Sequence, residues 1–262
     1  MNKVILISVD GTRPDGLLGC GNRFVEEMKK RGSYTLDARS VVPPVTLPAH
    51  LSIFHSIPPA RHGITTNTFT PFVRPVSGLF EQICLAGGKC AMFYGWEPLR
   101  DVARPKSLSA AGFVSARSEE NTDVTLTDMA LDCIEKRNPD FVFLYLVETD
   151  EKGGHDNGWM SNEYLRRISV AVDQIRRVIE QCGDSHTIIV TADHGGHDRT
   201  HGSDIPEDMT IPMFFFGDMF PKGRELRGIN LLDIAPTVAD IMGVLPAEEW
   251  EGKSVLDNTL RI

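Results

Sequence analysis

The sequence lacks the features that mark a disulfide-rich, membrane-embedded or nucleic-acid-binding protein. Its five cysteines are scattered without paired short spacing, and their odd number is typical of reduced thiols. The formal net charge of −9 argues against a surface that binds nucleic acid by neutralising phosphates. With no long apolar segment and no basic leader, we expect neither a membrane span nor an export signal. These absences predict a cytoplasmic protein without a membrane or nucleic-acid partner, and they leave small anionic substrates open.

Internal repeats, low-complexity tracts and linkers are lacking as well. The 262 residues, 41% hydrophobic and 24% charged, are enough for one sizeable α/β domain. We therefore expect a single domain over residues 1–262. The weak, mixed pattern of residues 97–121 is interpreted as a substrate-facing loop or a small cap.

What the sequence does contain is a set of three short apolar runs, each followed by acidic residues. Near-continuous Val, Ile, Leu and Phe is typical of a strand that is buried on both faces of a parallel sheet. Ligands of such sheets bind at the carboxyl ends of the strands, so the acids should converge there and repel one another unless cations neutralise them. A metal site is therefore predicted. The runs and acids are Val4–Val9 with Asp10, Phe141–Val147 with Asp150, and Thr187–Thr191 with Asp193.

Stretches with helical spacing alternate with these strands. The alternation predicts an α/β fold with a doubly wound, mostly parallel central sheet and helices on both faces. A connection rich in Val and Pro leads to Thr46, and Pro48 fits the first turn of the helix that follows. The expected helices are 23–31, 47–57, 79–86, 123–136, 163–182 and 232–242, and shorter strands are expected at 90–94 and 213–217.

Histidines accompany two of the acids. Asp193 and His194 offer an oxygen and a nitrogen ligand to a cation such as Zn²⁺, although this pair alone fits a helix cap with a surface histidine equally well. Asp150 and His155 form a second pair on a glycine-containing loop, and His201 offers a third nitrogen. A lone loop histidine is more often exposed than a ligand, but four such signals at the ends of different strands favour a metal site.

The remaining histidines are less informative. His197 and Asp198 lie in the same loop as His201, and spacing excludes neither as a ligand. The others are interpreted as structural: His50, His55, His62 and His186.

Taken in order, these motifs resemble the alkaline phosphatase superfamily, most closely its nucleotide pyrophosphatase/phosphodiesterase branch. The matching pieces are Asp10-Gly11, Thr46-Leu47-Pro48-Ala49-His50, His62-Gly63-Ile64 with Asn67, Asp150 with His155, Asp193-His194-Gly195, and His201-Gly202.

The resemblance implies a site with two divalent metal ions, Zn²⁺ in the first place and Mn²⁺ or Fe²⁺ as alternatives. One ion would be held by Asp10, Thr46, Asp193 and His194, and the other by Asp150, His155 and His201. The histidine before glycine, His201, is preferred to His197 on the same ground.

The resemblance also implies two catalytic residues. Thr46 would be the nucleophile and form a covalent phosphothreonine intermediate, since metal coordination can activate its weakly nucleophilic hydroxyl. It can at the same time be a helix cap. Asn67 would contact the phosphate, although the sequence around it alone favours a turn residue.

The segment from Asp10 to Asp15 also looks like the start of a sulfatase. Sulfatases of the usual type oxidise a Cys or Ser to formylglycine, whereas this chain has Thr46 at that position. A threonine cannot become that aldehyde, so formylglycine chemistry is not expected.

The leading interpretation is thus a metal-dependent hydrolase of small anionic phosphate esters, of phosphodiesterase or nucleotide pyrophosphatase type. Alternatives are a phosphomonoesterase, a phosphonate or sulfate ester hydrolase on the same two metals, and a non-catalytic metal-binding protein. A cationic side chain in the pocket would favour a dianionic monoester, and an apolar wall would favour a diester. The candidate cations are Arg13, Arg100, Lys152 and Arg199.

Overall fold

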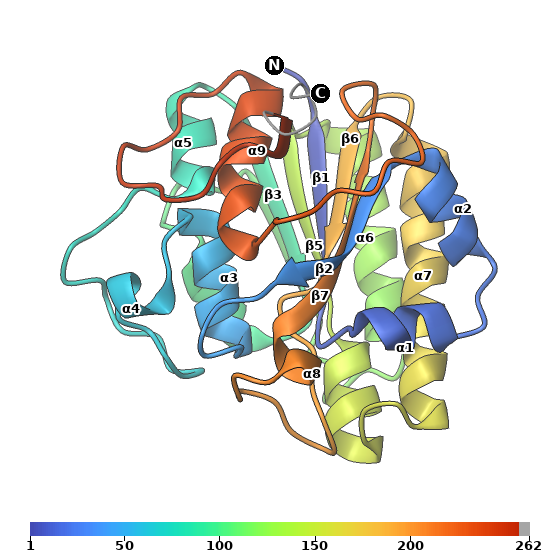
Figure 1. The fold of residues 1–262 in the computed structure, drawn as a ribbon. Helices are drawn as coiled ribbons and strands as arrows, with labels where there is room; N and C mark the ends of the chain where they lie inside the picture. Colours follow the sequence, from blue (N-terminus) through green and yellow to red (C-terminus); the bar gives the residue numbers. More distant parts are fainter. Residues whose placement is uncertain (257–262) are drawn as a thin grey trace.

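Seven strands form one sheet at the centre of the computed structural model, which describes residues 1–256 (Figure 1). Their order across the sheet is β2-β7-β6-β1-β5-β3-β4. Strand β7 runs antiparallel to β6 and to β2, and the other neighbouring pairs are parallel. The predicted doubly wound, mostly parallel sheet is confirmed. The strands are β1 (Val4–Val9), β2 (Ser33–Arg39), β3 (Cys90–Tyr94), β4 (Ala110–Phe113), β5 (Phe141–Leu146), β6 (Thr187–Thr191) and β7 (Thr210–Phe216).

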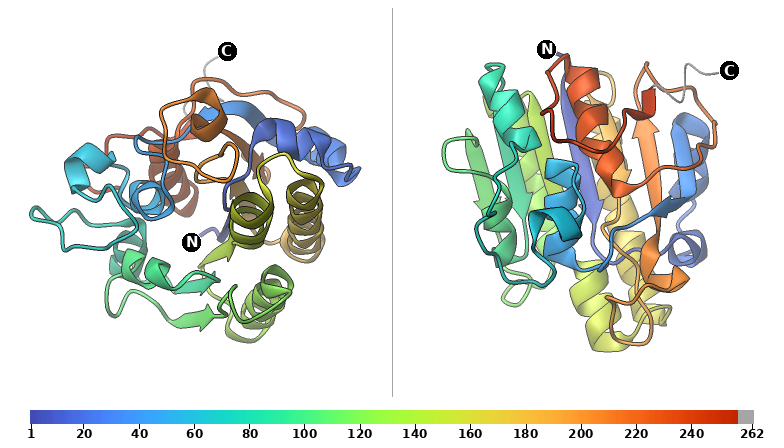
Figure 2. Two further views of the ribbon diagram at one scale, coloured as in Figure 1. Left: turned by 90° about the horizontal axis from the view of Figure 1, so that it is seen from below. Right: turned by 60° about the vertical axis from the view of Figure 1, so that its left-hand side comes forward.

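Helices cover both faces of the sheet (Figure 2). Helices α3, α5 and α9 pack on one face, and α1, α2, α6 and α7 pack on the other. Within residues 1–256, no helix has the length and apolar character needed to cross a lipid bilayer. The helices are α1 (Pro14–Gly19), α2 (Phe24–Arg31), α3 (Thr46–His55), α4 (Pro59–His62), α5 (Leu79–Leu85), η1 (Glu97–Val102), α6 (Thr122–Arg137), η2 (Thr149–His155), α7 (Asn162–Cys182), α8 (Pro206–Met209), η3 (Leu231–Asp233) and α9 (Ile234–Met242).

The central strands owe their continuous apolar sequence to this double cover. Val4 and Leu6 of β1 belong to the core under α3, α5 and α9, whereas Ile5 and Ile7 belong to the core under α6 and α7. All six residues of β1 and all six of β5 are buried. Successive side chains of a strand point to opposite faces, so both sets must be apolar.

Three segments differ from the sequence-based expectation. The connection before Thr46 contains β2, a half-buried edge strand whose polar residues give it no apolar run. Residues 97–121 form no separate cap, because β4 pairs with β3 and becomes the opposite edge of the main sheet. The glycine-containing loop is a single π-helical segment, η2.

Two buried carboxylates clamp η2 to the start of α6. Asp123 Oδ1 accepts the backbone N–H groups of Val147 and Glu148 at 2.8 and 3.3 Å. In return, Glu148 Oε1 accepts the N–H of Thr122 at 3.0 Å. Lys152 Nζ lies 2.6 Å from Glu148 Oε1 and supplies a compensating charge. The clamp holds the backbone that leads into Asp150.

Replacing Asp123 by Asn tests the clamp. Burial and then the charge of Glu148 raise the pKa of Asp123 to about 7, although hydrogen bonds from Val147 and Glu148 lower it. A carboxyl whose pKa is higher in the folded than in the unfolded chain holds its proton more tightly in the folded chain. Its contribution to the free energy of unfolding therefore falls as pH rises from the unfolded-state pKa to the folded-state pKa. The unfolding free energy of wild type minus that of Asp123→Asn should therefore fall between about pH 4 and pH 7.

Urea unfolding at several pH values measures this difference. Asp132→Asn, at an exposed carboxylate on the same helix, is the matched control. A wild-type minus Asp123→Asn difference that stays level or rises with pH would contradict the expectation.

Candidate metal centre

The acidic residues meet at the carboxyl-terminal edge of three adjacent strands. Asp10 follows β1, Asp193 follows β6, and Asp150 lies in η2 after β5. Strand β1 lies between β5 and β6, so the three ends are neighbours. The three residues are only 2%, 0% and 5% exposed, respectively. The predicted convergence of carboxylates is therefore present in the fold.

One group of possible ligands surrounds the imidazole of His194. Its Nε2 lies 3.3 Å from Asp10 Oδ1 and 3.3 Å from Asp193 Oδ2. Thr46 Oγ1 lies 3.1 Å from the same nitrogen. One ligand atom from each of Asp10, Asp193 and His194 fits within a set whose members are all within 4.8 Å of one another.

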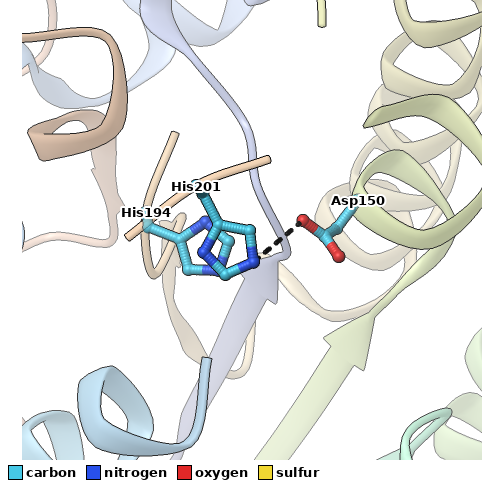
Figure 3. Close-up of side chains that lie close together, drawn as sticks. All are labelled: Asp150, His194 and His201. Atoms are coloured by element: carbon cyan, nitrogen blue, oxygen red, sulfur yellow. Dashed lines mark ion pairs between the residues drawn. The ribbon is translucent and has the colours of Figure 1, made fainter. Parts of the chain in front are cut away.

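A second group shares His194. Asp150, His194 and His201 also present ligand atoms within 4.8 Å of one another, and Asp150 Oδ1 lies 4.0 Å from His201 Nε2 (Figure 3). The rings of His194 and His201 stack with centroids 3.8 Å apart. His155 Nε2 approaches the other oxygen of Asp150 at 3.3 Å. All seven expected ligands therefore lie in one cluster, with His194 between the two groups rather than in the first alone.

Backbone carbonyls orient all three histidines in the same way. The Nδ1 atoms lie 2.8 Å from Gly195 O for His194, 3.0 Å from Pro44 O for His201 and 3.0 Å from Arg199 O for His155. A carbonyl only accepts hydrogen bonds, so each Nδ1 donates, and in the neutral imidazole each Nε2 keeps the lone pair. Those lone pairs belong to the atoms that face the carboxylates, which is the arrangement of metal-binding histidines.

The carboxylates have acceptor capacity that the described residues leave unused. Among residues 1–256, three buried carboxylate oxygens have no hydrogen-bond partner, and all three lie at this edge: Asp10 Oδ1, Asp150 Oδ1 and Asp193 Oδ2. Burial of an unpartnered charged oxygen is unfavourable, and a cation is the ligand that would satisfy all three. The mixed oxygen and nitrogen donor set fits Zn²⁺, Mn²⁺ or Fe²⁺.

Burial and mutual repulsion shift the pKa values of these acids. Burial and then the charges of neighbouring aspartates raise the pKa of Asp10 and of Asp150 well above the ordinary value. Burial acts on Asp193 in the same direction, but His194 and His50 outweigh it and lower the pKa of Asp193. Burial and then His194 lower the pKa of His201 to about 3, so its imidazole is neutral at physiological pH. Neutral imidazole is the form that binds metals.

Thr46 is the first residue of α3 and follows the N-cap residue, Val45, so it does not occupy the expected cap position. Its backbone is oriented instead by the side chain of Asn67, whose Oδ1 accepts the N–H of Leu47 at 3.0 Å. The Nδ2 donors of Asn67 are therefore directed away from Leu47. Asn67 lines the same cavity as Thr46. The expected turn residue thus reaches the site.

Two polar residues that the sequence analysis set aside or missed support the ligands. His50 Nδ1 lies 2.7 Å from Thr46 O and 3.5 Å from Asp193 Oδ2. The spacing of four residues between Thr46 and His50 was the available signal, because it places both on one face of a helix. Tyr145, in the middle of an apolar run, donates its hydroxyl to Asp10 Oδ2.

His197, Asp198 and the histidines that were interpreted as structural lie outside both groups of possible ligands. His197 Nδ1 lies 2.7 Å from Asp208 Oδ1. Asp198 is exposed, and its backbone oxygen accepts the N–H of Trp159. His55 and His62 pack against Phe72. His186 precedes β6 at the opposite end of the sheet.

A cavity of about 390 Å³ opens above the cluster. Two of its lining residues, Trp96 and Arg117, had no signal in the sequence, because they lie on loops that only the folding of the sheet brings together. Val147 ends the second apolar run, and Glu151 follows Asp150 in η2. The remaining lining residues are Asp10, Thr46, Asn67, Asp150, His155 and His201.

Comparison with curated proteins finds partial relatives among phosphate-transferring enzymes. Phosphopentomutase of Thermotoga petrophila is 29% identical over 135 residues, or 50% of this chain and 33% of that protein. The 2,3-bisphosphoglycerate-independent phosphoglycerate mutase of Clostridioides difficile is 28% identical over 137 residues, or 50% of this chain and 26% of that protein. The aligned part thus spans at most about a third of the length of these relatives.

Solved structures share the fold over nearly the whole chain. Inactive murine ectonucleotide pyrophosphatase / phosphodiesterase 5 in complex with AMP has a TM-score of 0.82 at 15% identity, covering 98% of this chain and 99% of that one. Phosphonate monoester hydrolase of Agrobacterium radiobacter has a TM-score of 0.75 at 15% identity, covering 98% and 76%. A 2-O GAG sulfatase has a TM-score of 0.75 at 16% identity, covering 99% and 74%. At such identities the likeness establishes the fold alone.

The family itself is established by a sequence model described as type I phosphodiesterase / nucleotide pyrophosphatase, which matches residues 4–208. The match contains Asp10, Thr46, Asp150, Asp193 and His201, and it confirms the resemblance inferred from the motifs. This chain belongs to the type I phosphodiesterase / nucleotide pyrophosphatase family.

Proposed function

We propose that this chain is a metal-dependent hydrolase of phosphate esters, of phosphodiesterase type, with Thr46 as its nucleophile. The observation that carries the proposal is the position of the Thr46 hydroxyl. Thr46 lines the cavity, follows the N-cap position held by Val45, and has its hydroxyl 3.1 Å from His194 Nε2, beside carboxylates with unpartnered oxygens. A hydroxyl with this environment is poised for activation rather than for capping.

Two divalent ions fit the donor set. Asp10, Asp193, His194 and Thr46 would hold one, and Asp150, His155 and His201 would hold the other, with His194 near both. Bound cations would neutralise the aspartates, lower the pKa of the Thr46 hydroxyl and offset the charge of the phosphoryl group.

The chain's own groups would guide the transfer. The Thr46 oxygen attacks phosphorus and forms a phosphothreonine ester, while the leaving oxygen departs with the electrons of the broken P–O bond. Water then attacks the phosphothreonine, releasing phosphate or its monoester and restoring the hydroxyl. The positive amino-terminal end of the α3 dipole favours negative charge at Thr46. The Asn67 amide donates to a non-bridging phosphoryl oxygen.

A second candidate is phosphoryl transfer to another hydroxyl instead of to water. It draws support from the mutases that share part of this sequence. The same nucleophile serves both reactions, because they differ only in the acceptor that attacks the phosphothreonine. Analysis of products with and without an added sugar phosphate distinguishes them.

Metal binding should stabilise the fold. Apoprotein prepared with a chelator should gain about 5 °C or more in Tm on addition of saturating Zn²⁺ or Mn²⁺, because cations relieve the repulsion among the buried aspartates. His201→Ala should lose most of this gain. His197→Ala, whose imidazole contacts Asp208 outside the cluster, is the matched control. Equal gains in all three proteins would rule out a site that includes His201.

Thr46→Ala should lower turnover of bis(4-nitrophenyl) phosphate and 4-nitrophenyl phosphate by at least about a thousandfold, because the nucleophile is removed. Thr65→Ala, at an exposed threonine of a nearby loop, should keep normal rates. Mass spectrometry of acid-quenched wild-type reactions should find phosphate on Thr46. Wild-type rates in Thr46→Ala would refute the covalent mechanism.

Asn67→Asp separates the two roles of the Asn67 amide. Aspartate keeps an oxygen for the N–H of Leu47 but loses the Nδ2 donors, so Tm should hold while kcat falls by about a hundredfold. Thr68→Ala, in the same exposed loop, is the control. An unchanged kcat in Asn67→Asp would remove Asn67 from the reaction.

A further inference from the structure

The cavity above the cluster has one Arg or Lys side chain in its lining, taken over residues 1–256, and this is Arg117. It is a cation that the sequence did not single out. Three of the four cations that were considered bind other groups. Arg13 contacts Asp15 and the backbone oxygen of Gly196, Arg100 pairs with Glu97, and Lys152 pairs with Glu148.

The backbone that carries Arg117 is held from two sides. Ala116, the residue before it, donates its N–H to Gly95 O at 3.0 Å, which fixes the loop beside the end of β3. On the other side, Lys152 Nζ donates to the backbone oxygens of Glu119 and Glu120, both at 2.7 Å. Lys152 belongs to η2, the element that carries Asp150. The loop is thereby tied to the segment that bears the candidate metal ligands.

The Arg117 side chain is directed by Glu151. Its Nε lies 3.3 Å from Glu151 Oε1, and Glu151 immediately follows Asp150 in the chain. Guanidinium has five N–H donors, and this contact uses only the one on Nε. The side chain is 81% exposed, so its terminal N–H groups are accessible from the cavity mouth. Such a fork suits bidentate binding of a phosphoryl group.

We propose that Arg117 is a specificity-determining residue that binds the second negative charge of a dianionic phosphate ester. The proposal rests on the proposed phosphate-ester hydrolysis but departs from a preference for simple diesters: among the esters that Thr46 would attack, a dianionic one would bind better than a monoanionic diester. A monoanionic diester offers no second charge to the guanidinium, so Arg117 discriminates between the two kinds of ester. Glu151 is a positioning residue that keeps the guanidinium over the cavity.

The discriminating quantity is the ratio of kcat/KM for 4-nitrophenyl phosphate to kcat/KM for bis(4-nitrophenyl) phosphate. Arg117→Ala should lower this ratio about tenfold relative to wild type, mainly through KM of the monoester. Arg117→Lys keeps the charge but not the fork and should recover part of the loss. Arg100→Ala is the matched control, because Arg100 is also exposed and paired with an acidic residue but does not line the cavity.

Binding to variants without the nucleophile separates this proposal from the proposed function. In metal-loaded Thr46→Ala protein, calorimetric titration with 4-nitrophenyl phosphate should give an affinity about ten times higher than in the Thr46→Ala, Arg117→Ala double variant. Affinity for bis(4-nitrophenyl) phosphate should be the same in both. Failure of the wild type to hydrolyse either ester would sink the proposed function, whereas the binding comparison would still decide the role of Arg117. If Arg117→Ala changed the affinity for both esters equally, or changed neither affinity, the proposed role of Arg117 would be overturned.

Discussion

The structure depends on the placement of three aspartates, Asp10, Asp150 and Asp193, at one buried edge of the sheet. Each has a side-chain oxygen that accepts no hydrogen bond from the described residues, and burial with mutual repulsion raises the pKa of the first two. Such a group is tolerated when cations complete it. The fold therefore keeps an electrostatic imbalance, a concentration of uncompensated negative charge at this edge, that favours metal binding. Bound metals would in turn attract a phosphate group to a chain of net charge −9.

The rest of the scaffold holds this imbalance in place. Strands β1, β5 and β6 are covered on both faces, so their ends are fixed relative to one another. Backbone carbonyls accept from the Nδ1 atoms of His155, His194 and His201, and this leaves their Nε2 atoms directed at the aspartates. Second contacts of this kind orient metal ligands and tune their basicity. Rigid strands thus position Asp10 and the neighbours of Thr46, while hydrogen bonds finish the geometry.

In the proposed function, substrate recognition would fall to a different part of the molecule. The cavity walls come from segments after β3, β4 and β5, which carry Trp96, Arg117 and Glu151. Loops on a fixed scaffold can change without disturbing the core, so one metal cluster can accept different esters. The fold itself is shared with a nucleotide phosphodiesterase, a phosphonate hydrolase and a sulfatase at low sequence identity.

The sequence by itself determined the buried strands and the doubly wound sheet, because apolar runs followed by acids report burial on both faces and the position of a strand end. Its motifs indicated the family through their resemblance. Thr46 could likewise be placed at a helix start from Pro48 two residues later. Only the tertiary structure decided that His194 lies between both ligand groups, that His197 faces Asp208, and that β2 and β4 form the sheet edges. It alone brought Arg117 to the cavity. The reason is physical: strand periodicity is a local property of the chain, whereas edge strands, histidine orientation and pocket walls depend on contacts between residues far apart in sequence.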